Sequence, residues 1–282
     1  MNPIITLTTD FGANDAYTAA MKGVILSINP RVSIVDLCHQ IEPQGIFQAA
    51  FVLGTAYSYF PKGTIHIVVV DPGVGTTRRA LLLTTPSAFF LAPDNGVLSY
   101  IIEEASERED SLPEDVKRPF LEAYDRPLGS DMEATILTNS RYFRQPVSAT
   151  FHGRDIFAPV AAFLSLGISA RDFGETASSI KALHIPRPKV RADGTLAGCV
   201  LHIDRFGNLI TNFRREDLPE VATIIEIREH SIQGLISSYE EGDGLLAIIG
   251  SSGHMEISVK NGSAADVLEA KVGDEVRIRV AR

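Results

Sequence analysis

"TIHIVVVDPGVGTTRR", residues 64–79, is the stretch from which the architecture of this chain can be inferred. Its apolar run is nearly unbroken and ends in Asp71, a pattern typical of a strand buried on both faces of a parallel sheet. Pro-Gly and a second glycine follow, and they indicate a tight turn before two arginines. The turn is not predicted to bind phosphate, because no Gly-Lys-Ser/Thr sequence completes a phosphate-binding loop.

Strand patterns of the same kind alternate with helical patterns in the N-terminal part of the chain. Short β-branched runs at 4–10 and 32–37 flank an apolar helical pattern at 15–30, which a proline ends. A second helical pattern at 45–61 also ends at a proline and precedes the strand of residues 64–71. This alternation predicts parallel βαβ units and a three-layer α/β domain with a mostly parallel sheet.

A domain boundary is expected in "IPRPKVRADGTLAG", residues 185–198, which combines helix breakers with basic residues. We predict an N-terminal α/β domain at 1–187 and a smaller C-terminal domain at 188–282. The C-terminal part holds short strand patterns separated by turns, which predicts a mostly antiparallel β domain. A highly charged segment at 103–134 is predicted to be a surface excursion with one short helix.

Composition and charge limit the classes of function. The chain has 282 residues, a net charge of −9 and no basic block, so a nucleic-acid surface is not expected. A membrane role is not expected either, because the apolar runs fall short of the roughly 20 residues that span a bilayer. The N-terminus lacks the basic region of a signal peptide. Cys38 and Cys199 lie far apart and outside any CxxC, which favours a reduced, cytoplasmic protein without a cysteine-based zinc site.

Polar residues at the ends of the predicted strands form the candidate site. In an open parallel sheet, ligands bind at the carboxyl ends of the strands. Asp10, Asp71, the pair Asp94 and Asn95, and His152 are expected at such positions. Each has a glycine nearby that lets the backbone approach a ligand. Each is equally compatible with a turn former or a helix cap.

Other familiar sites have weak support in the sequence. No GxGxxG follows the first strand, and no GxSxG elbow offers a nucleophilic serine. The strand-end acids and histidine are metal ligands by type, but their spacing alone does not support a metal site. Asp36 and His39 in "VDLCHQ" are interpreted as groups that only satisfy the end of a strand.

Asp71, Arg78 and His152 together could bind and polarise a water molecule. Arginine does not lose its proton in proteins, but it can hold a carboxylate in place and keep it ionised. Histidine can accept or donate a proton near neutral pH. On residue chemistry alone, a structural salt bridge beside an unrelated histidine is the preferred interpretation.

Six motifs, taken in order, resemble the S-adenosylmethionine hydroxide adenosyltransferases, a family related to the fluorinases and chlorinases. The resemblance implies an N-terminal α/β domain, a C-terminal β-barrel domain and a homotrimer with its sites at subunit interfaces. It also implies hydrolysis of S-adenosylmethionine to adenosine and methionine without a metal or other cofactor. The motifs are "TLTTDFG", "VVVDPGVGTTRR", "LAPDNGVL", "TFHGRDIFAP", "DRFGNLITN" and "GSSGHMEISVKNGSAA".

The resemblance assigns roles by position. Asp71, Arg78 and His152 match the residues that activate the water. The substrate-binding residues it implies are Asp10 at the ribose, Asp204 at the methionine ammonium, Phe206 and Asn208 at the adenine, Ser251 at the methionine end, and Phe11, Asn95 and Gly153 within the matching motifs. Ser252 departs from an arginine found near this position in the fluorinase.

Differences from the halogenases indicate the nucleophile. Asp71 replaces a halogenase tyrosine, and His152-Gly153 replaces a Tyr-Ser pair. The chain has no tryptophan, whereas the fluorinase site uses one. An anionic Asp71 would repel a halide, so water is the expected nucleophile and halide transfer is disfavoured. A non-catalytic protein that binds adenosine or S-adenosylmethionine and a metal-dependent hydrolase remain alternatives. The proton acceptor is left open between Asp71 and His152.

Overall fold

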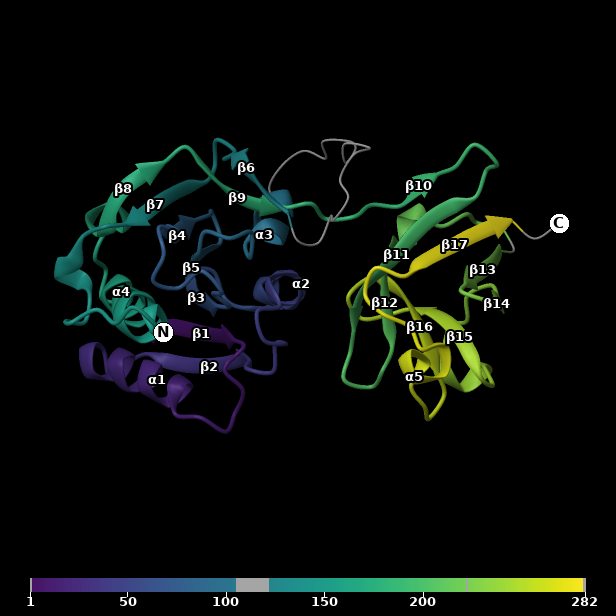
Figure 1. Ribbon diagram of the computed structural model, residues 1–282, viewed down its shortest axis with the longest axis horizontal. Coiled ribbons are helices and arrows are strands. Elements are labelled where there is room, and N and C mark those ends of the chain that lie inside the picture. The colour runs from purple at the N-terminus through teal and green to yellow at the C-terminus, as the bar shows by residue number, and fades with distance from the viewer. Residues whose placement is uncertain (1, 105–121, 222, 281–282) are drawn as a thin grey trace. The chain divides into compact units, whose positions relative to one another are not determined.

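The computed structural model describes residues 2–104, 122–221 and 223–280. These residues form two compact units, one that ends at Ile185 and one that begins at Pro186 (Figure 1). The central part of the charged segment, residues 105–121, lies outside the described residues, so the short helix expected there is not tested. Within the described ranges, no helix is both long and apolar enough to cross a membrane.

The N-terminal unit is built on a seven-stranded sheet with the order β2-β1-β3-β5-β4-β7-β8. The first four strands in this order are parallel, and the other three continue the sheet in antiparallel pairs. The strands are β1 (Ile4–Thr9), β2 (Ser33–Cys38), β3 (Thr64–Val69), β4 (Ala80–Thr84), β5 (Ala88–Pro93), β7 (Glu133–Leu137) and β8 (Gly174–Ala177). Every residue of β3 is buried, which confirms the prediction from its apolar run.

Helices cover both faces of this sheet and complete the three predicted layers. One core lies between the sheet and the helices α1 (Tyr17–Ile28) and α4 (Ala158–Ser165). The other core lies between the sheet and the helices α2 (Ile46–Ala56) and α3 (Ser99–Glu104). The remaining elements are the paired strands β6 (Ala123–Pro127) and β9 (Ser179–Leu183), the π-helix η3 (Gly153–Phe157) and the 3-10 helices η1 (Tyr57–Tyr59), η2 (Ser140–Tyr142) and η4 (Ala170–Phe173).

The C-terminal unit is a strongly curved antiparallel sheet with the order β14-β13-β17-β11-β12-β16-β15, and β10 pairs with β11. A bridge between Ile236 and Ile248 joins the segment after β14 to β15, so the sheet is nearly closed into a barrel. Its elements are β10 (Lys189–Val190), β11 (Leu196–Ile203), β12 (Leu209–Arg214), β13 (Thr223–Ile227), β14 (His230–Gln233), β15 (Leu245–Ile249), β16 (His254–Val259), β17 (Glu275–Val280), α5 (Ala264–Leu268), η5 (Arg215–Asp217) and η6 (Tyr239–Glu241). The predicted fold class, an α/β domain followed by a β-barrel domain, is confirmed.

Candidate active site

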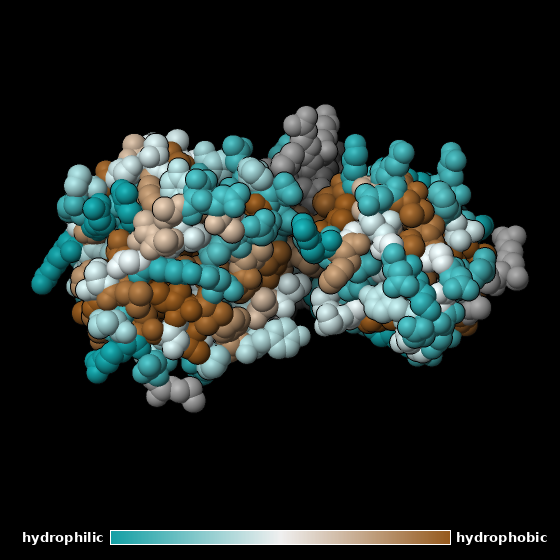
Figure 2. Space-filling view, turned by 90° about the horizontal axis from the view of Figure 1, so that it is seen from below, coloured by the Kyte–Doolittle hydropathy of each residue, from teal (hydrophilic) through white to brown (hydrophobic). Residues whose placement is uncertain are grey.

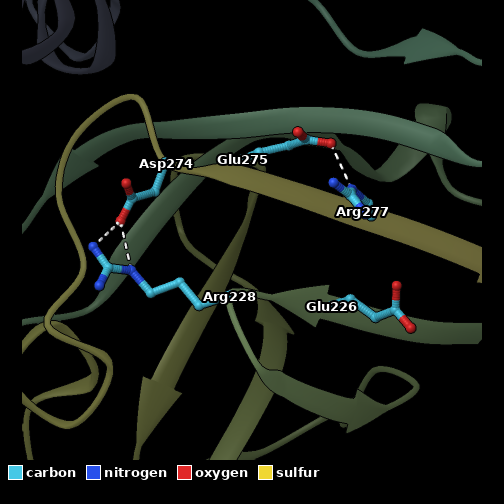
Figure 3. Close-up of a pocket in the computed structure, with 5 residues that line it drawn as sticks. All are labelled: Glu226, Arg228, Asp274, Glu275 and Arg277. Carbon is cyan, nitrogen blue, oxygen red and sulfur yellow. Dashed lines mark hydrogen bonds and ion pairs between the residues drawn. The ribbon is translucent and has the colours of Figure 1, made fainter.

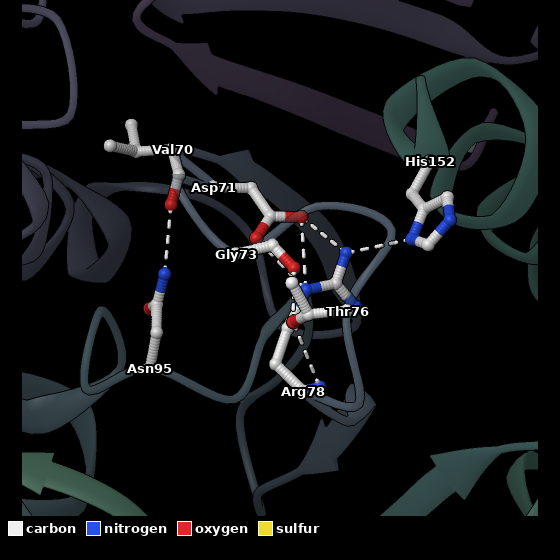
Figure 4. A network of polar contacts seen from close by, with 7 residues as sticks. All are labelled: Val70, Asp71, Gly73, Thr76, Arg78, Asn95 and His152. Carbon is white, nitrogen blue, oxygen red and sulfur yellow. Dashed lines mark hydrogen bonds and ion pairs between the residues drawn. The ribbon is translucent and has the colours of Figure 1, made fainter. Parts of the chain in front are cut away.

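Asp71 and Arg78 form a buried ion pair at the carboxyl end of β3. A turn carries the chain back from Asp71, so that Arg78 arrives just before β4 (Figure 4). Arg78 Nε lies 2.9 Å from Asp71 Oδ1 and 3.0 Å from Oδ2, and Arg78 Nη2 also pairs with Oδ2. Only 5% of the Asp71 side chain and 11% of the Arg78 side chain are exposed. The guanidinium therefore holds the carboxylate by charge-assisted hydrogen bonds.

His152 completes this network from a distant part of the chain. Its Nδ1 lies 2.8 Å from Arg78 Nη2 (Figure 4). Arginine has no acceptor atom, so Arg78 donates this bond, and the proton of a neutral His152 lies on Nε2. Burial lowers the pKa of His152, the charge of Arg78 lowers it further, and the charges of Asp71 and Asp155 act in the opposite direction. The three predicted catalytic side chains are thus one contiguous group, with His152 in its neutral form.

Gly75 allows the two loops that carry this group to touch. It adopts a φ of +76°, and a Cβ added to it would lie 2.2 Å from the carbonyl oxygen of Ala149. The turn is also held by hydrogen bonds from Val74 N to Asp71 O and from Thr76 N to Gly73 O, each 3.2 Å long. The loop after β3 therefore packs directly on the chain just before His152.

The expectation that His152 follows a strand is wrong. The preceding strand, β7, ends at Leu137, and His152 instead caps the π-helix Gly153–Phe157, which leads into α4. Irregular helical turns of this kind occur often at functional sites, because they redirect side chains. Gly153 is buried, and a Cβ at this position would lie 3.2 Å from Met21 Sδ. The substrate contact expected for Gly153 stays a prediction.

Asp10 lies directly after β1, on the strand next to β3 in the sheet. Its Oδ2 accepts a hydrogen bond of 2.9 Å from the backbone N–H of Gln44. Its Oδ1 has no hydrogen-bond partner within the described part of the chain. Asp10 therefore keeps an acceptor available for a ligand hydroxyl, as its predicted ribose contact requires.

An aromatic cluster joins the Asp10 segment to the His152 segment. The ring centroid of Phe11 lies 5.4 Å from that of Tyr17 and 5.7 Å from that of Phe151, and the last two lie 5.2 Å apart. Tyr17 is 49% exposed. The sequence analysis did not single out Tyr17; the signal for it is the aromatic spacing in "DFGANDAY", which places Phe11 and Tyr17 on either side of a turn.

Asn95 braces the site from the end of β5, the strand next to β3, whereas Asp94 beside it pairs with other partners. Asn95 Nδ2 donates to the carbonyl oxygen of Val70, at 2.9 Å, and so fixes the backbone just before Asp71 (Figure 4). Asp94 is buried, and it accepts from Arg79 Nε and from the backbone N–H of Lys181, both at 2.7 Å. The alternative interpretation of Asp94 as a structural residue is therefore the better one.

The predicted residues of the C-terminal unit organise the turn between β11 and β12. Asp204 Oδ1 accepts from the backbone N–H groups of Phe206 and Asn208, at 2.8 and 2.9 Å, and Oδ2 accepts from Asn208 Nδ2 at 2.9 Å. Gly207, with a φ of +82°, packs against Ser263. This rigid turn presents Phe206, whose side chain is 76% exposed.

Ser251 and Ser252 lie in the turn between β15 and β16, where Ser251 is exposed and Ser252 Oγ lies 3.2 Å from His254 Nδ1.

Glu256, on β16, is a further carboxylate that the sequence analysis missed. It is only 8% exposed and accepts a hydrogen bond of 3.2 Å from the hydroxyl of Tyr239. Burial raises the pKa of Glu256, and the charge of Asp204 also raises it. The available signal was an acid inside an otherwise apolar strand pattern.

The predicted site residues thus fall into two groups, one in each unit, and the structure brings together the members of the N-terminal group. A shallow hollow of about 210 Å³ on the C-terminal unit includes none of them (Figure 3). Its charged side chains pair with one another, as Arg228 with Asp274 and Arg277 with Glu275. Within the ranges that the structure describes, no group of three or more His, Cys, Asp or Glu side chains is placed to hold a metal ion.

Comparison with known proteins assigns the family. Residues 5–174 match the SAM hydroxide adenosyltransferase N-terminal domain, and residues 198–277 match the C-terminal domain of the same family. The chain is 36% identical to the (R)-S-adenosyl-L-methionine hydrolase of Salinispora tropica, over 98% of this chain and 97% of that protein. A fluorinase of an Actinoplanes species is 28% identical, over 77% of this chain and 74% of its own.

A solved structure has the same fold over nearly the whole chain. The crystal structure of an uncharacterised conserved protein from Thermotoga maritima superposes with a TM-score of 0.82 at 32% identity. The match covers 97% of this chain and 99% of that one. The motifs, the fold and these matches agree, and the chain belongs to the SAM hydroxide adenosyltransferase family.

Proposed function

We propose that this protein is an S-adenosylmethionine hydrolase: water attacks C5′ of S-adenosyl-L-methionine and yields adenosine and L-methionine. The observation that carries the proposal is the contiguous Asp71–Arg78–His152 network, in a chain whose relatives include (R)-S-adenosyl-L-methionine hydrolases. A protein that only binds the nucleoside would not need a carboxylate, a guanidinium and a neutral imidazole in one contiguous group.

The leaving group explains what the site has to supply. Methionine leaves from a sulfonium as a neutral thioether, so no acid is needed at sulfur. The enzyme must instead hold an oxygen nucleophile in line with the C5′–S bond, and such placement can lower a barrier by several kcal/mol. An ionised Asp71 accepts a hydrogen bond from water and repels a halide, which fits hydrolysis rather than halogenation.

The hydrogen-bond pattern favours Asp71 as the proton acceptor. His152 Nδ1 accepts from Arg78, and Nε2 of the neutral ring carries the proton, so the ring has no free acceptor in this arrangement. As the C5′–O bond forms, the attacking water becomes strongly acidic, and a carboxylate then suffices to take its proton. In this scheme, Arg78 holds Asp71 in place and His152 orients Arg78.

Hydrolysis in labelled water provides the test. The purified protein is incubated with S-adenosylmethionine in H₂¹⁸O, and the products are separated by chromatography and weighed by mass spectrometry. We expect adenosine with ¹⁸O at the 5′ oxygen, together with unlabelled methionine. No adenosine above the buffer control, from protein shown to be folded, would overturn the proposal. Labelled homoserine with 5′-methylthioadenosine, or labelled methanol with S-adenosylhomocysteine, would overturn the site of attack.

We also propose that turnover needs no metal or other cofactor. The proposed scheme assigns every step to residues of the chain and to water. Activity should therefore survive exhaustive dialysis against a chelator, and a loss that added Mg²⁺ or Zn²⁺ restores would favour the metal-dependent alternative.

We propose a cytoplasmic homotrimer with the sites at subunit interfaces. Figure 2 looks at the side of α1 and β2 and shows hydrophobic residues gathered on this face of the N-terminal unit. The large apolar side chains exposed on these elements are Tyr17, Leu26 and Val35, and β2 is an edge strand. Apolar patches and free strand edges mark association surfaces.

The proposed cytoplasmic location is supported by the two cysteines. Both are free, as expected in a reducing compartment.

A further inference from the structure

A series of polar contacts links α1 and β2 to the backbone next to Asp10. Its residues have no role in the proposed reaction. It begins on α1, where Lys22 Nζ lies 2.6 Å from Asp36 Oδ2 on β2. Asp36 Oδ1 lies 3.0 Å from His39 Nε2, and His39 Nδ1 lies 2.9 Å from Thr9 Oγ1. Thr9 Oγ1 accepts in turn from the backbone N–H of Phe11, at 3.3 Å. This series of polar contacts thus ends at Phe11, the residue that follows Asp10.

Thr9 Oγ1 lies within hydrogen-bond distance of both the His39 ring and the backbone N–H of Phe11. Asp36 has only acceptors, so a proton on His39 Nε2 faces Asp36 Oδ1 at 3.0 Å in an ion-pair contact that is not a hydrogen bond, while His39 Nδ1 and Thr9 Oγ1 share a hydrogen bond of 2.9 Å. Whichever of the two atoms donates, Thr9 Oγ1 keeps a lone pair that accepts from the N–H of Phe11. The side chains of Thr9 and His39 therefore connect the backbone at Phe11 to Asp36 on β2.

The same histidine holds the other side of Asp10. The backbone carbonyl of His39 accepts a hydrogen bond of 2.8 Å from the N–H of Gly12, whose φ is +68°. Thr9, immediately before Asp10, is completely buried, and the His39 side chain is only 13% exposed. The residues on both sides of Asp10 are therefore fixed to His39. One oxygen of the Asp10 carboxylate is bound to Gln44, and the other has no hydrogen-bond partner among the residues that the structure describes.

We infer that His39 and Thr9 are positioning residues that hold the Asp10 carboxylate at the angle needed to bind the vicinal hydroxyls of the nucleoside. This inference rests on the proposed function, because it takes Asp10 to be the ribose ligand. A carboxylate on an unbraced turn would sample several orientations, and ordering it on binding would weaken the affinity for the substrate. Asp36 and His39 then do more than satisfy a strand end.

The test compares variants that differ only in the hydroxyl or the ring nitrogen. Thr9→Val keeps the shape and burial of the side chain but removes Oγ1, whereas Thr9→Ser keeps the hydroxyl. His39→Ala removes the ring that contacts Thr9 and Asp36, whereas His39→Asn places an amide oxygen close to the position of Nδ1. We expect Thr9→Val and His39→Ala to weaken adenosine binding and raise KM by about tenfold, the effect of one lost hydrogen bond. Thr9→Ser and His39→Asn should lie within about threefold of the natural protein.

Further measurements separate positioning from stability. Because the Asp71 network is independent of this chain of contacts, kcat should change less than about threefold in the same variants. In an Asp10→Ala background, Thr9→Val should have no further effect on adenosine affinity, since the carboxylate it positions is gone. Circular dichroism and thermal melting identify any variant that fails to fold. If Thr9→Val fails to fold, the comparison of His39→Ala with His39→Asn tests the inference instead.

The outcomes distinguish this inference from the proposed function. Adenosine affinity is measured by calorimetry and does not depend on turnover. A natural protein that binds adenosine but forms none from S-adenosylmethionine overturns the hydrolase proposal alone. Equal affinities for adenosine in folded Thr9→Val, His39→Ala and natural protein overturn the positioning inference alone, as does a full effect of Thr9→Val in the Asp10→Ala background. A natural protein that does not bind adenosine overturns both.

Discussion

Asp71 is anchored before any substrate arrives, because Arg78 contacts both of its carboxylate oxygens. A fixed charge in a site with little water acts on a reacting group without first having to reorient. The sequence placed Asp71 at the end of a strand and Arg78 a short turn away, so their pairing could be predicted from local spacing. The contact of His152 with Arg78 could not be predicted in this way, since it depends on two loops that are far apart in the chain.

Replacing Asp71 by asparagine tests its charge with little change in shape. We expect Asp71→Asn to lower turnover by at least about 100-fold, because the amide cannot accept the proton of the attacking water. Adenosine affinity should change by less than about threefold, since the nucleoside is bound elsewhere. The measurements are initial rates by chromatography and adenosine titration by calorimetry.

Asp94→Asn is the matched control, because Asp94 is also a buried carboxylate paired with an arginine at a strand end. It should lower the free energy of unfolding but leave turnover per folded chain near that of the natural protein. Equal losses of turnover in the two variants would assign the effect of Asp71→Asn to structure.

The pH profile reports on His152. Its pKa lies below the ordinary value of 6.5, chiefly because of burial, so the ring is neutral above that pH and gains a proton only further into the acid range. The protonated ring cannot accept from Arg78, and the network opens. We expect kcat to be constant with respect to this group above about pH 6.5 and to fall on the acid side. In His152→Gln, rates measured across pH 4.5–8 should be low but should lack that acid limb; an unchanged limb would assign it to another group.

At the scale of elements, the loop after β3 depends on one glycine. Gly75→Ala would place a methyl group 2.2 Å from the carbonyl oxygen of Ala149 and would keep a left-handed φ of +76°. The two loops must then separate, which moves Arg78 away from His152. We expect a fall in turnover of more than about tenfold and a loss of about 1–3 kcal/mol of unfolding free energy, measured in urea.

Gly63→Ala is the control for backbone strain, since Gly63 has a φ of +86° and no atom within 4 Å of an added Cβ. It should cost only about 1 kcal/mol and should leave turnover unchanged. If Gly63→Ala lowers turnover as much as Gly75→Ala does, the contact between the loops is not the cause.

The elements that the sequence analysis found and missed differ in how their polar groups are satisfied. The apolar runs of β3 and β15 predict buried strands without further information. The strand pattern alone does not predict β12, formed by "LITNFR", because Thr211 and Asn212 interrupt its apolar run. Both residues are buried, and they bond to the backbone of Met255, Pro186 and Cys199, at positions far along the chain. Such partners are invisible in a local pattern.

At the scale of the whole molecule, self-association is the property to test first. Val35→Glu places a charge on the exposed edge strand β2, where the natural side chain is 38% exposed. We expect this variant to shift the molecular mass measured by light scattering from that of a trimer toward that of a single chain, because a buried unpaired charge strongly opposes association. Turnover should fall in parallel.

Val190→Glu, at a more exposed apolar residue of the C-terminal unit, is a control for a charge introduced elsewhere. It should leave both the mass and the rate unchanged if the proposed surface is the one that associates. A trimeric and fully active Val35→Glu variant would move the association surface away from β2.

The turn around Asp204 has a kinetic consequence. Asp204 accepts its side-chain hydrogen bonds from Phe206 and Asn208 in its own turn, and the Asp71 network lies within the other unit, so each of the two groups of predicted site residues is preformed in its own unit. Under the proposed assembly, with its sites at subunit interfaces, dilution alone would silence the enzyme without disturbing either group. Specific activity would then rise with protein concentration and reach a plateau.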